Sequence, residues 1–179
     1  MILAIDIGNT NIVIGCCADG QAIFRERVST NPTATVLEYA AMLKMAFDMN
    51  RADITAVDGA ILSSVVPAVT LTMRDAVHKY LHLTPLVVGP GIKTGLRIHI
   101  DNPAQLGSDL VVDAVAGIHH YPLPQIIIDM GTATTVSVLD AEGGYRGGMI
   151  LPGVAVSHDA LASLSLIHIS EPTRHAQIS

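Results

Sequence analysis

The sequence predicts an α/β protein with two similarly built domains, each with a mixed sheet, of which the second is incomplete. One pattern occurs twice: an apolar strand ending in aspartate, a turn of glycine and threonine, and a second apolar strand. The copies are 5–15 (IDIGNTNIVIG) and 126–138 (IIIDMGTATTVSV), and Asp6 and Asp129 lie 123 positions apart. Strand and helix patterns alternate between the copies, as an α/β unit requires. Half of the 179 residues are apolar, which is enough to bury a substantial core.

The first copy has the features of a phosphate-binding hairpin. The apolar run 2–5 does not alternate, which predicts a strand buried on both faces. Asp6 ends this strand, and because burying an unpaired charge is costly, its carboxylate is expected to face a cleft, a cation or hydrogen-bond donors. Gly8 permits a tight turn and a close approach of a ligand to the main chain. Three short polar side chains follow it, Asn9, Thr10 and Asn11, where turn amides form an anion-binding concavity.

The second copy repeats this chemistry after another β-branched strand. Asp129 ends the strand, and the turn and second strand supply Gly131, Thr132 and Thr134. A single hairpin of this kind is more often only a turn. Two copies in matching contexts instead favour a duplicated fold with a ligand site between the halves.

Helical and strand periodicity assigns the remaining elements in order. Before the second copy we expect strand 21–28, helix 35–49, strand 60–65, a helix from Pro67, strand 85–89, and a linking helix from Asn102-Pro103 to about Gly117. The second unit then has strands 125–129, 134–140 and 143–150 and a helix near Ser157.

The linking helix has two distinct sides. Its expected buried stripe consists of Leu106, Leu110, Ala114 and Ile118. Asp109 and Asp113 lie together on nearly the opposite side, which faces either water or the cleft between domains.

The two units differ in length, which sets the expected domain boundaries. We assign 1–115 to the first domain and 116–163 to a partial second domain. The stretch 164–179 has neither clean periodicity nor the strands that a full second copy needs, and it is similar to translated sequencing-adaptor read-through. We expect it to be a non-native tail on a truncated gene product, with apolar surface left uncovered in the second domain.

Composition excludes several classes of function. The formal net charge is −6, Lys and Arg are not clustered, and there are no Trp, two Phe and four Tyr, which argues against nucleic-acid binding. No apolar stretch is long enough to span a bilayer, and the N-terminus lacks the basic region of a secretion signal. Adjacent Cys16 and Cys17 on a strand point to opposite faces, which argues against a disulfide between them. A soluble cytoplasmic protein is expected.

Several motifs, in order, carry a family resemblance. They are DIGNTNIVIG at the start, VGPGIKTGL (88–96), DNP (101–103), GSDLVVDAVAG (107–117), DMGTATT (129–135) and GGMILPG (147–153). Over residues 1–163 the chain resembles type III pantothenate kinases, in the superfamily of actin, sugar kinases and heat-shock chaperone ATPases. The resemblance implies two ribonuclease-H-like domains and ATP-dependent phosphorylation of pantothenate to 4′-phosphopantothenate, the first step of coenzyme A synthesis. It also implies Mg²⁺, a monovalent cation (K⁺ or NH₄⁺) and a homodimer.

The resemblance also assigns roles by position. Asp109 matches the general base, Asp6 the magnesium-side carboxylate and Asp129 the carboxylate associated with the monovalent cation. The phosphate-binding positions are Asp6, Gly8, Asn9, Thr10, Asn11, Gly131, Thr132 and Thr134. The pantothenate-binding positions are Gly107, Ser108, Asp109 and Ile100. Gly147, Gly148, Pro152 and Gly153 belong to a stretch close to the nucleotide.

Two positions depart from the family pattern. Leu110 stands where the family has Arg, and Ile100 where it has Tyr, and both positions typically contact pantothenate. Lys93 and Arg97 are nearby basic residues in the sequence. Two alternatives therefore remain: a non-catalytic nucleotide-binding or regulatory relative, and an actin-like-fold kinase for another small hydroxyl compound.

Overall fold

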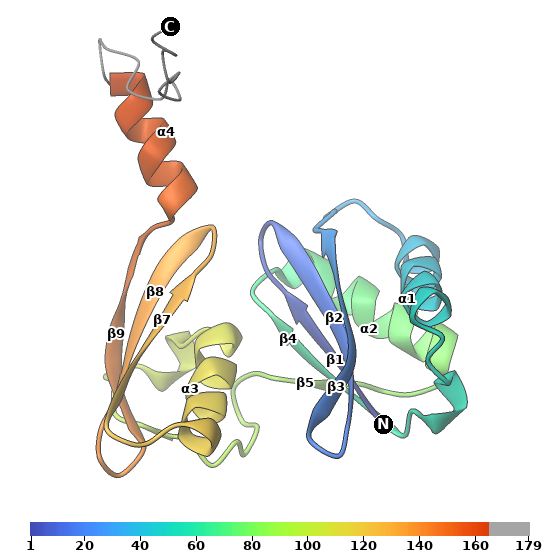
Figure 1. Cartoon of the computed structure of the whole chain (residues 1–179), viewed down its shortest axis with the longest axis horizontal. Helices are drawn as coiled ribbons and strands as arrows, with labels where there is room; N and C mark the ends of the chain where they lie inside the picture. Colours follow the sequence, from blue (N-terminus) through green and yellow to red (C-terminus); the bar gives the residue numbers. More distant parts are fainter. Residues whose placement is uncertain (165–179) are drawn as a thin grey trace, which may run out of the picture.

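The computed structural model describes residues 1–164, which form two mixed sheets and four α-helices (Figure 1). The first sheet has the order β3-β2-β1-β4-β5, and its strands are β1 Ile2–Ile7, β2 Asn11–Ala18, β3 Gln21–Ser29, β4 Gly59–Ser64 and β5 Leu86–Val87. The strands β1, β2 and β3 pair antiparallel, whereas β4 lies parallel to both β1 and β5. The predicted mixed α/β architecture is confirmed.

Two helices cover one face of this sheet, α1 (Val36–Asn50) and α2 (Pro67–Leu81). Thr35 caps α1 with a capping box to Glu38, and Pro67 occupies the first turn of α2, where a missing N–H costs nothing. The core beneath them contains fully buried Leu43 and Leu62. The two helices therefore cover the core face of the first sheet.

The opposite face of the first sheet is not buried in the same way, which corrects one expectation. Along β1, Leu3, Ile5 and Ile7 are buried at 0–2% exposure, whereas Ala4 is half-buried and Asp6 is exposed. On that side Ala4 and Asp6 border a cavity, and Ile2 is 44% exposed. The prediction that run 2–5 is buried on both faces was wrong.

The second sheet has the order β6-β9-β8-β7, with β6 Arg97–Ile98, β7 Gln125–Met130, β8 Ala133–Leu139 and β9 Gly144–Pro152. The antiparallel run β7-β8-β9 repeats the run β1-β2-β3 of the first sheet. Its small core contains Ala114, Leu139 and Tyr145. Many apolar side chains of this sheet are exposed, among them Ile126, Ile128, Met130, Met149 and Ile150.

The linking helix begins later than predicted. Asn102-Pro103 starts only the short 3-10 turn η2 (Pro103–Gln105), and α3 runs from Ser108 to His120. Leu106 and Gly107 between them take extended backbone, with ψ of 121° and 147°. Ala114 is buried as expected, but Leu106 lies outside the helix and lines cavities instead.

Other differences are local. The strand predicted at 85–89 is shorter in the structure, where it forms β5. The short strand β6 and the 3-10 turn η1 (Ile54–Ala56) had no sequence signal. The last helix, α4, spans Val154–Leu164. The predicted boundary at 115 falls inside α3 and stays a prediction. Apart from its first residue, the predicted tail 164–179 lies outside the described residues. Among the described helices, none has the length and apolar character needed to cross a membrane.

Candidate functional site

The two hairpin turns meet. The hydroxyl oxygens of Thr10 and Thr132 lie 2.7 Å apart, although the residues are 122 positions apart in the chain. Figure 1 shows the turn between β1 and β2 beside the turn between β7 and β8. The fold therefore brings both predicted phosphate-binding turns to one place.

The first turn is held by its own backbone and by Thr30, the residue after β3. Gly8 N donates to Asn11 O at 2.9 Å, which closes the turn. Thr30 N donates to Thr10 O at 2.9 Å, and the Thr30 hydroxyl donates to Gly8 O at 2.7 Å. The Asn9 side chain remains exposed beside them. Sequence reasoning missed Thr30, because a threonine after a strand carries no signal that it will support a turn 20 residues earlier.

The second turn is held by the segment that follows β9. Gly131 N donates to Ala133 O at 3.0 Å, and Gly153 N donates to Thr132 O at 3.2 Å. A Cβ atom on Gly153 would overlap the carbonyl oxygens of Gly131 and Thr132. A glycine is therefore required where the chain passes the turn. Thr134 lies next to the turn on β8, paired with Met130.

The first turn of α3 is anchored to the first sheet by Ser108. The buried Ser108 hydroxyl accepts from Ser64 N at 3.0 Å and donates to Ser64 O at 2.9 Å, and Ser63 Oγ lies 3.2 Å away. Ser63 is the cross-strand neighbour of Asp6. Next to the anchor, Asp109 Oδ1 accepts from Leu110 N at 2.9 Å. The anchor therefore fixes Asp109 relative to the strand that carries Asp6.

Four carboxylates share the resulting cleft. Burial raises the pKa of Asp6, the Ser63 hydroxyl opposes this shift, and the charges of Asp109 and Asp129 add to it. Burial followed by the charges of Asp129, Asp109 and Asp6 raises the pKa of Asp113 to about 6. The Asp109 and Asp113 side of α3 therefore faces the cleft rather than open water. Asp113 was outside the predicted site, although its i, i+4 spacing from Asp109 was the available signal.

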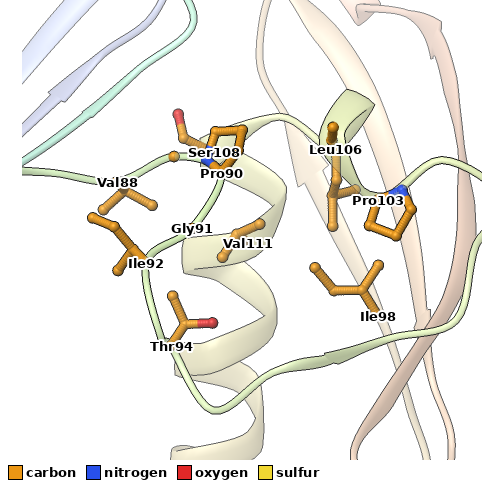
Figure 2. Close-up of a pocket in the computed structure, with 12 residues that line it drawn as sticks. Val88, Pro90, Gly91, Ile92, Thr94, Ile98, Pro103, Leu106, Ser108 and Val111 are labelled. Carbon is orange, nitrogen blue, oxygen red and sulfur yellow. The ribbon is translucent and has the colours of Figure 1, made fainter.

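Three cavities surround α3. The loop cavity, of about 300 Å³, lies between α3 and residues 88–98 (Figure 2). Its lining includes Val111 of α3 and Ile92 of the loop, and Ile98 and Leu106 line it as well (Figure 2). No residue that lines this cavity is charged, so it supplies no group for proton or phosphoryl transfer.

The second-sheet cavity, of about 370 Å³, lies between α3, the end of β6 and β9. Both Ile100 and Leu110 line it, so the two departures from the family pattern meet in one place. Asp101 is its single charged lining residue, and neither Lys93 nor Arg97 reaches it. Arg97 instead donates to the carbonyl oxygen of Glu142.

The first-sheet cavity, of about 260 Å³, covers the cleft-facing side of β1, β2 and β3 and reaches Val112 of α3. Its lining is mostly apolar, and its charged lining residues are Asp6 and Arg25. Neither the repeated motif nor the family resemblance pointed to Arg25.

The residues present fit a cation that is shared with a phosphate ligand rather than held by the protein alone. Residues 1–164 contain no group of three or more His, Cys, Asp or Glu side chains placed to hold a metal ion. Asp6 borders the cleft, and its pKa is raised first by burial and then by the charges of Asp109 and Asp129. Mg²⁺ is commonly bound by one or two carboxylates together with substrate phosphates and water. A site of this type suits Asp6, and Asp129 offers the matching carboxylate on the second hairpin.

Solved structures with a similar arrangement show the fold. The ethanolamine utilization protein EutJ from Carboxydothermus hydrogenoformans superposes with a TM-score of 0.53 at 14% identity, covering 90% of this chain and 56% of that one. The Aquifex aeolicus Ppx/GppA phosphatase gives 0.52 at 16% identity, covering 89% and 55%. This chain spans little more than half of either, and such identities show the fold alone. The fold is that of the actin-like ATPase and sugar-kinase class.

The relatives at higher identity define the family. The family model for type III pantothenate kinases matches residues 2–176, beyond Ser163, where the motif resemblance ends. Type III pantothenate kinases from an Exiguobacterium species and from Halalkalibacterium halodurans are 45% and 42% identical over 176 residues, covering 96% of this chain and 69% of their own length. The chain belongs to the type III pantothenate kinase family.

Proposed function

We propose that the protein transfers the γ-phosphoryl group of ATP to pantothenate, forming 4′-phosphopantothenate in the first step of coenzyme A synthesis. The observation that carries this proposal is the meeting of the two hairpin turns at Thr10 and Thr132, 2.7 Å apart, beside the carboxylates of the cleft. Membership of the family supports the choice of reaction and acceptor.

The hairpins bind the phosphate chain in this mechanism. Gly8, Asn9, Thr10 and Asn11 offer amides and short polar side chains from one side. Gly131, Thr132 and Thr134 offer them from the other. Amides and hydroxyls that converge from two turns stabilise the negative charge of a phosphate without requiring a basic cluster.

Asp109 acts as the general base. Its carboxylate orients the acceptor hydroxyl and accepts its proton as the hydroxyl oxygen bonds to the γ-phosphorus and the bond from that phosphorus to the β–γ bridging oxygen breaks. The Ser108 anchor to Ser64 supports this role, because it limits how far Asp109 moves relative to Asp6.

Two cations complete the proposed site. Asp6 would hold Mg²⁺ together with the phosphates, and Asp129 would hold K⁺ or NH₄⁺. When bound, the cations supply positive charge that offsets the charge on the transferred phosphoryl group. The cluster of Asp6, Asp109, Asp113 and Asp129 supports the need for such charge.

The acceptor is proposed to contact Gly107, Ser108, Asp109 and Ile100. A second candidate function is favoured by the second-sheet cavity, whose lining at Ile100 and Leu110 is apolar and includes no cation. Such a lining also suits a kinase for another small hydroxyl compound, or a relative that binds nucleotide without turnover.

The test is phosphopantothenate formation from ATP, Mg²⁺, K⁺ and pantothenate, measured by mass spectrometry. Asp109→Asn should lower kcat by about 10²- to 10⁴-fold, the usual contribution of a general base, and leave ATP binding intact. Asp75→Asn, on the exposed side of α2, is the matched control. Nucleotide binding without product in the unaltered protein would support the non-catalytic alternative instead.

We further propose a cytoplasmic homodimer that acts without nucleic acid or membrane partners, with domains at 1–115 and 116–163. Exposed apolar side chains on the second sheet and α4 support self-association. Light scattering coupled to size-exclusion chromatography tests the dimer.

A further inference from the structure

A short series of hydroxyl groups connects the first sheet to α3. Ser63 and Ser64 are the last two residues of β4, and Ser108 is the first residue of α3. Ser63 Oγ donates to Ser108 Oγ at 3.2 Å, and the Ser108 hydroxyl donates to Ser64 O at 2.9 Å. Ser63 is 5% exposed and Ser108 is 8% exposed, so little water competes for these bonds.

The Ser63 hydroxyl also lies next to the Asp6 carboxylate. The parallel pairing of β1 with β4 puts Ser63 beside Asp6, and residues paired in this way point to the same face of a sheet. Burial raises the pKa of Asp6, and a hydrogen bond from the Ser63 side chain opposes this rise. Ser63 therefore lies between the Asp6 carboxylate and the first residue of α3.

We propose that Ser63 is a positioning residue, whose hydroxyl holds the Asp6 carboxylate in place relative to Asp109 by bonding to Asp6 on one side and to Ser108 on the other. The inference rests on the proposed kinase function, in which Asp6 and Asp109 act on the two reactants. Neither the repeated motif nor the family resemblance assigned a role to Ser63.

The hydrogen count at the two serines determines how this bridge works. A serine hydroxyl has one hydrogen to donate and two lone pairs to accept with. The hydrogen of Ser108 is donated to Ser64 O, so the bond between the two serines uses the hydrogen of Ser63. Ser63 therefore alternates this one hydrogen between Ser108 Oγ and Asp6. The bond to an ionised carboxylate is the stronger of the two, because it is charge-assisted.

The Asp109 end of the bridge does not depend on Ser63. Asp109 Oδ1 accepts from Leu110 N at 2.9 Å, and it lies over Gly107, where an added Cβ would overlap it. These contacts are made within the first turn of α3 and its cap. Loss of the Ser63 hydroxyl should therefore free the Asp6 carboxylate and leave Asp109 where it is.

The kinetic experiment removes the Ser63 hydroxyl. Ser63→Ala should lower kcat about 10- to 100-fold, the usual loss when a hydrogen-bond partner of a metal-binding carboxylate is removed, and should leave the KM for pantothenate unchanged. Ser63→Thr keeps a hydroxyl and suits a strand, so it should recover most of kcat. Ser137→Ala is the matched control and should behave as the unaltered protein, because Ser137 is also buried but its hydroxyl lies 3.3 Å from Tyr145 OH in the second sheet.

Urea denaturation measures the same contact without turnover. The effects of Ser63→Ala and Asp6→Asn on the free energy of unfolding should not add, because both changes remove one charge-assisted bond. The effects of Ser137→Ala and Asp6→Asn should add. Additive effects of Ser63→Ala and Asp6→Asn would overturn the inference, as would equal kcat values for Ser63→Ala and Ser137→Ala in an active enzyme.

The two measurements separate this inference from the proposed function. Failure of the unaltered protein to phosphorylate pantothenate counts against the proposed function alone. The denaturation comparison then decides whether Ser63 holds Asp6, because it needs neither substrate nor metal ion.

Discussion

Replacing Asp113 by asparagine removes a carboxyl group that the fold makes hard to ionise. The pKa of Asp113 is raised from 3.8 to about 6, first by burial and then by the charges of Asp129, Asp109 and Asp6. This difference corresponds to about 3 kcal/mol at most, and to about 1–2 kcal/mol once solvent screening of a partly exposed group is allowed for.

The direction of the pH dependence of stability follows from proton linkage. Because the folded protein binds this proton more tightly than the unfolded chain does, the stability that Asp113 contributes is fully present below about pH 4 and is lost as pH rises through about 6. Asp113→Asn should match the unaltered protein near pH 4. Above about pH 7 it should be more stable by about 1–2 kcal/mol.

The assay is urea denaturation at several pH values in a chelator and at low salt. Asp53→Asn is a control of opposite sign, because the hydroxyl and amide of Thr55 hold the pKa of Asp53 below its usual value. The Asp53→Asn variant should be less stable than the unaltered protein at neutral pH and equally stable at acidic pH. A difference in the free energy of unfolding between Asp113→Asn and the unaltered protein that does not change with pH would refute the reasoning.

Three further changes test the fold and the hairpins. Gly153→Ala should lower the free energy of unfolding by about 1–3 kcal/mol, because the added Cβ meets backbone oxygens of the second turn. Both the Tm and the nucleotide affinity should fall. An unchanged Tm would show that the segment moves freely. Thr132→Val removes the bond to Thr10 and should cost at most about 1 kcal/mol in denaturation. In calorimetry it should weaken nucleotide binding, and unaltered binding would contradict the role of this turn. Leu43→Ala opens a cavity in a fully buried site and should cost about 2–5 kcal/mol by urea titration, a loss below 1 kcal/mol being inconsistent with the core described here.

The local elements were predictable where the sequence carries turn and helix-capping signals. The hairpin at Gly8, the capping box at Thr35 and the proline that begins α2 each act over a few residues, and each element forms close to where it was expected. The linking helix was misplaced for the opposite reason. Ser108 bonds to Ser64, which is distant in sequence, so local propensity at Asn102-Pro103 could not locate the start of α3.

The sequence predicted a site between two hairpins but not the contacts that assemble it. The repeated motif indicated Asp6, Asp129 and a shared cleft, and the contact between Thr10 and Thr132 agrees with that expectation. The part played by Thr30 depends on the register of β3 against β2, which a sequence specifies only indirectly. Long-range pairing therefore accounts for what sequence reasoning missed.

The alternation along β1 has a consequence for how this strand tolerates substitution. Leu3, Ile5 and Ile7 point into the core, whereas Ala4 and Asp6 point toward the first-sheet cavity. Random replacement along the strand should therefore give two phenotypes with a period of two residues. Odd positions should lower the amount of folded protein in cells, and even positions should spare abundance while impairing catalysis.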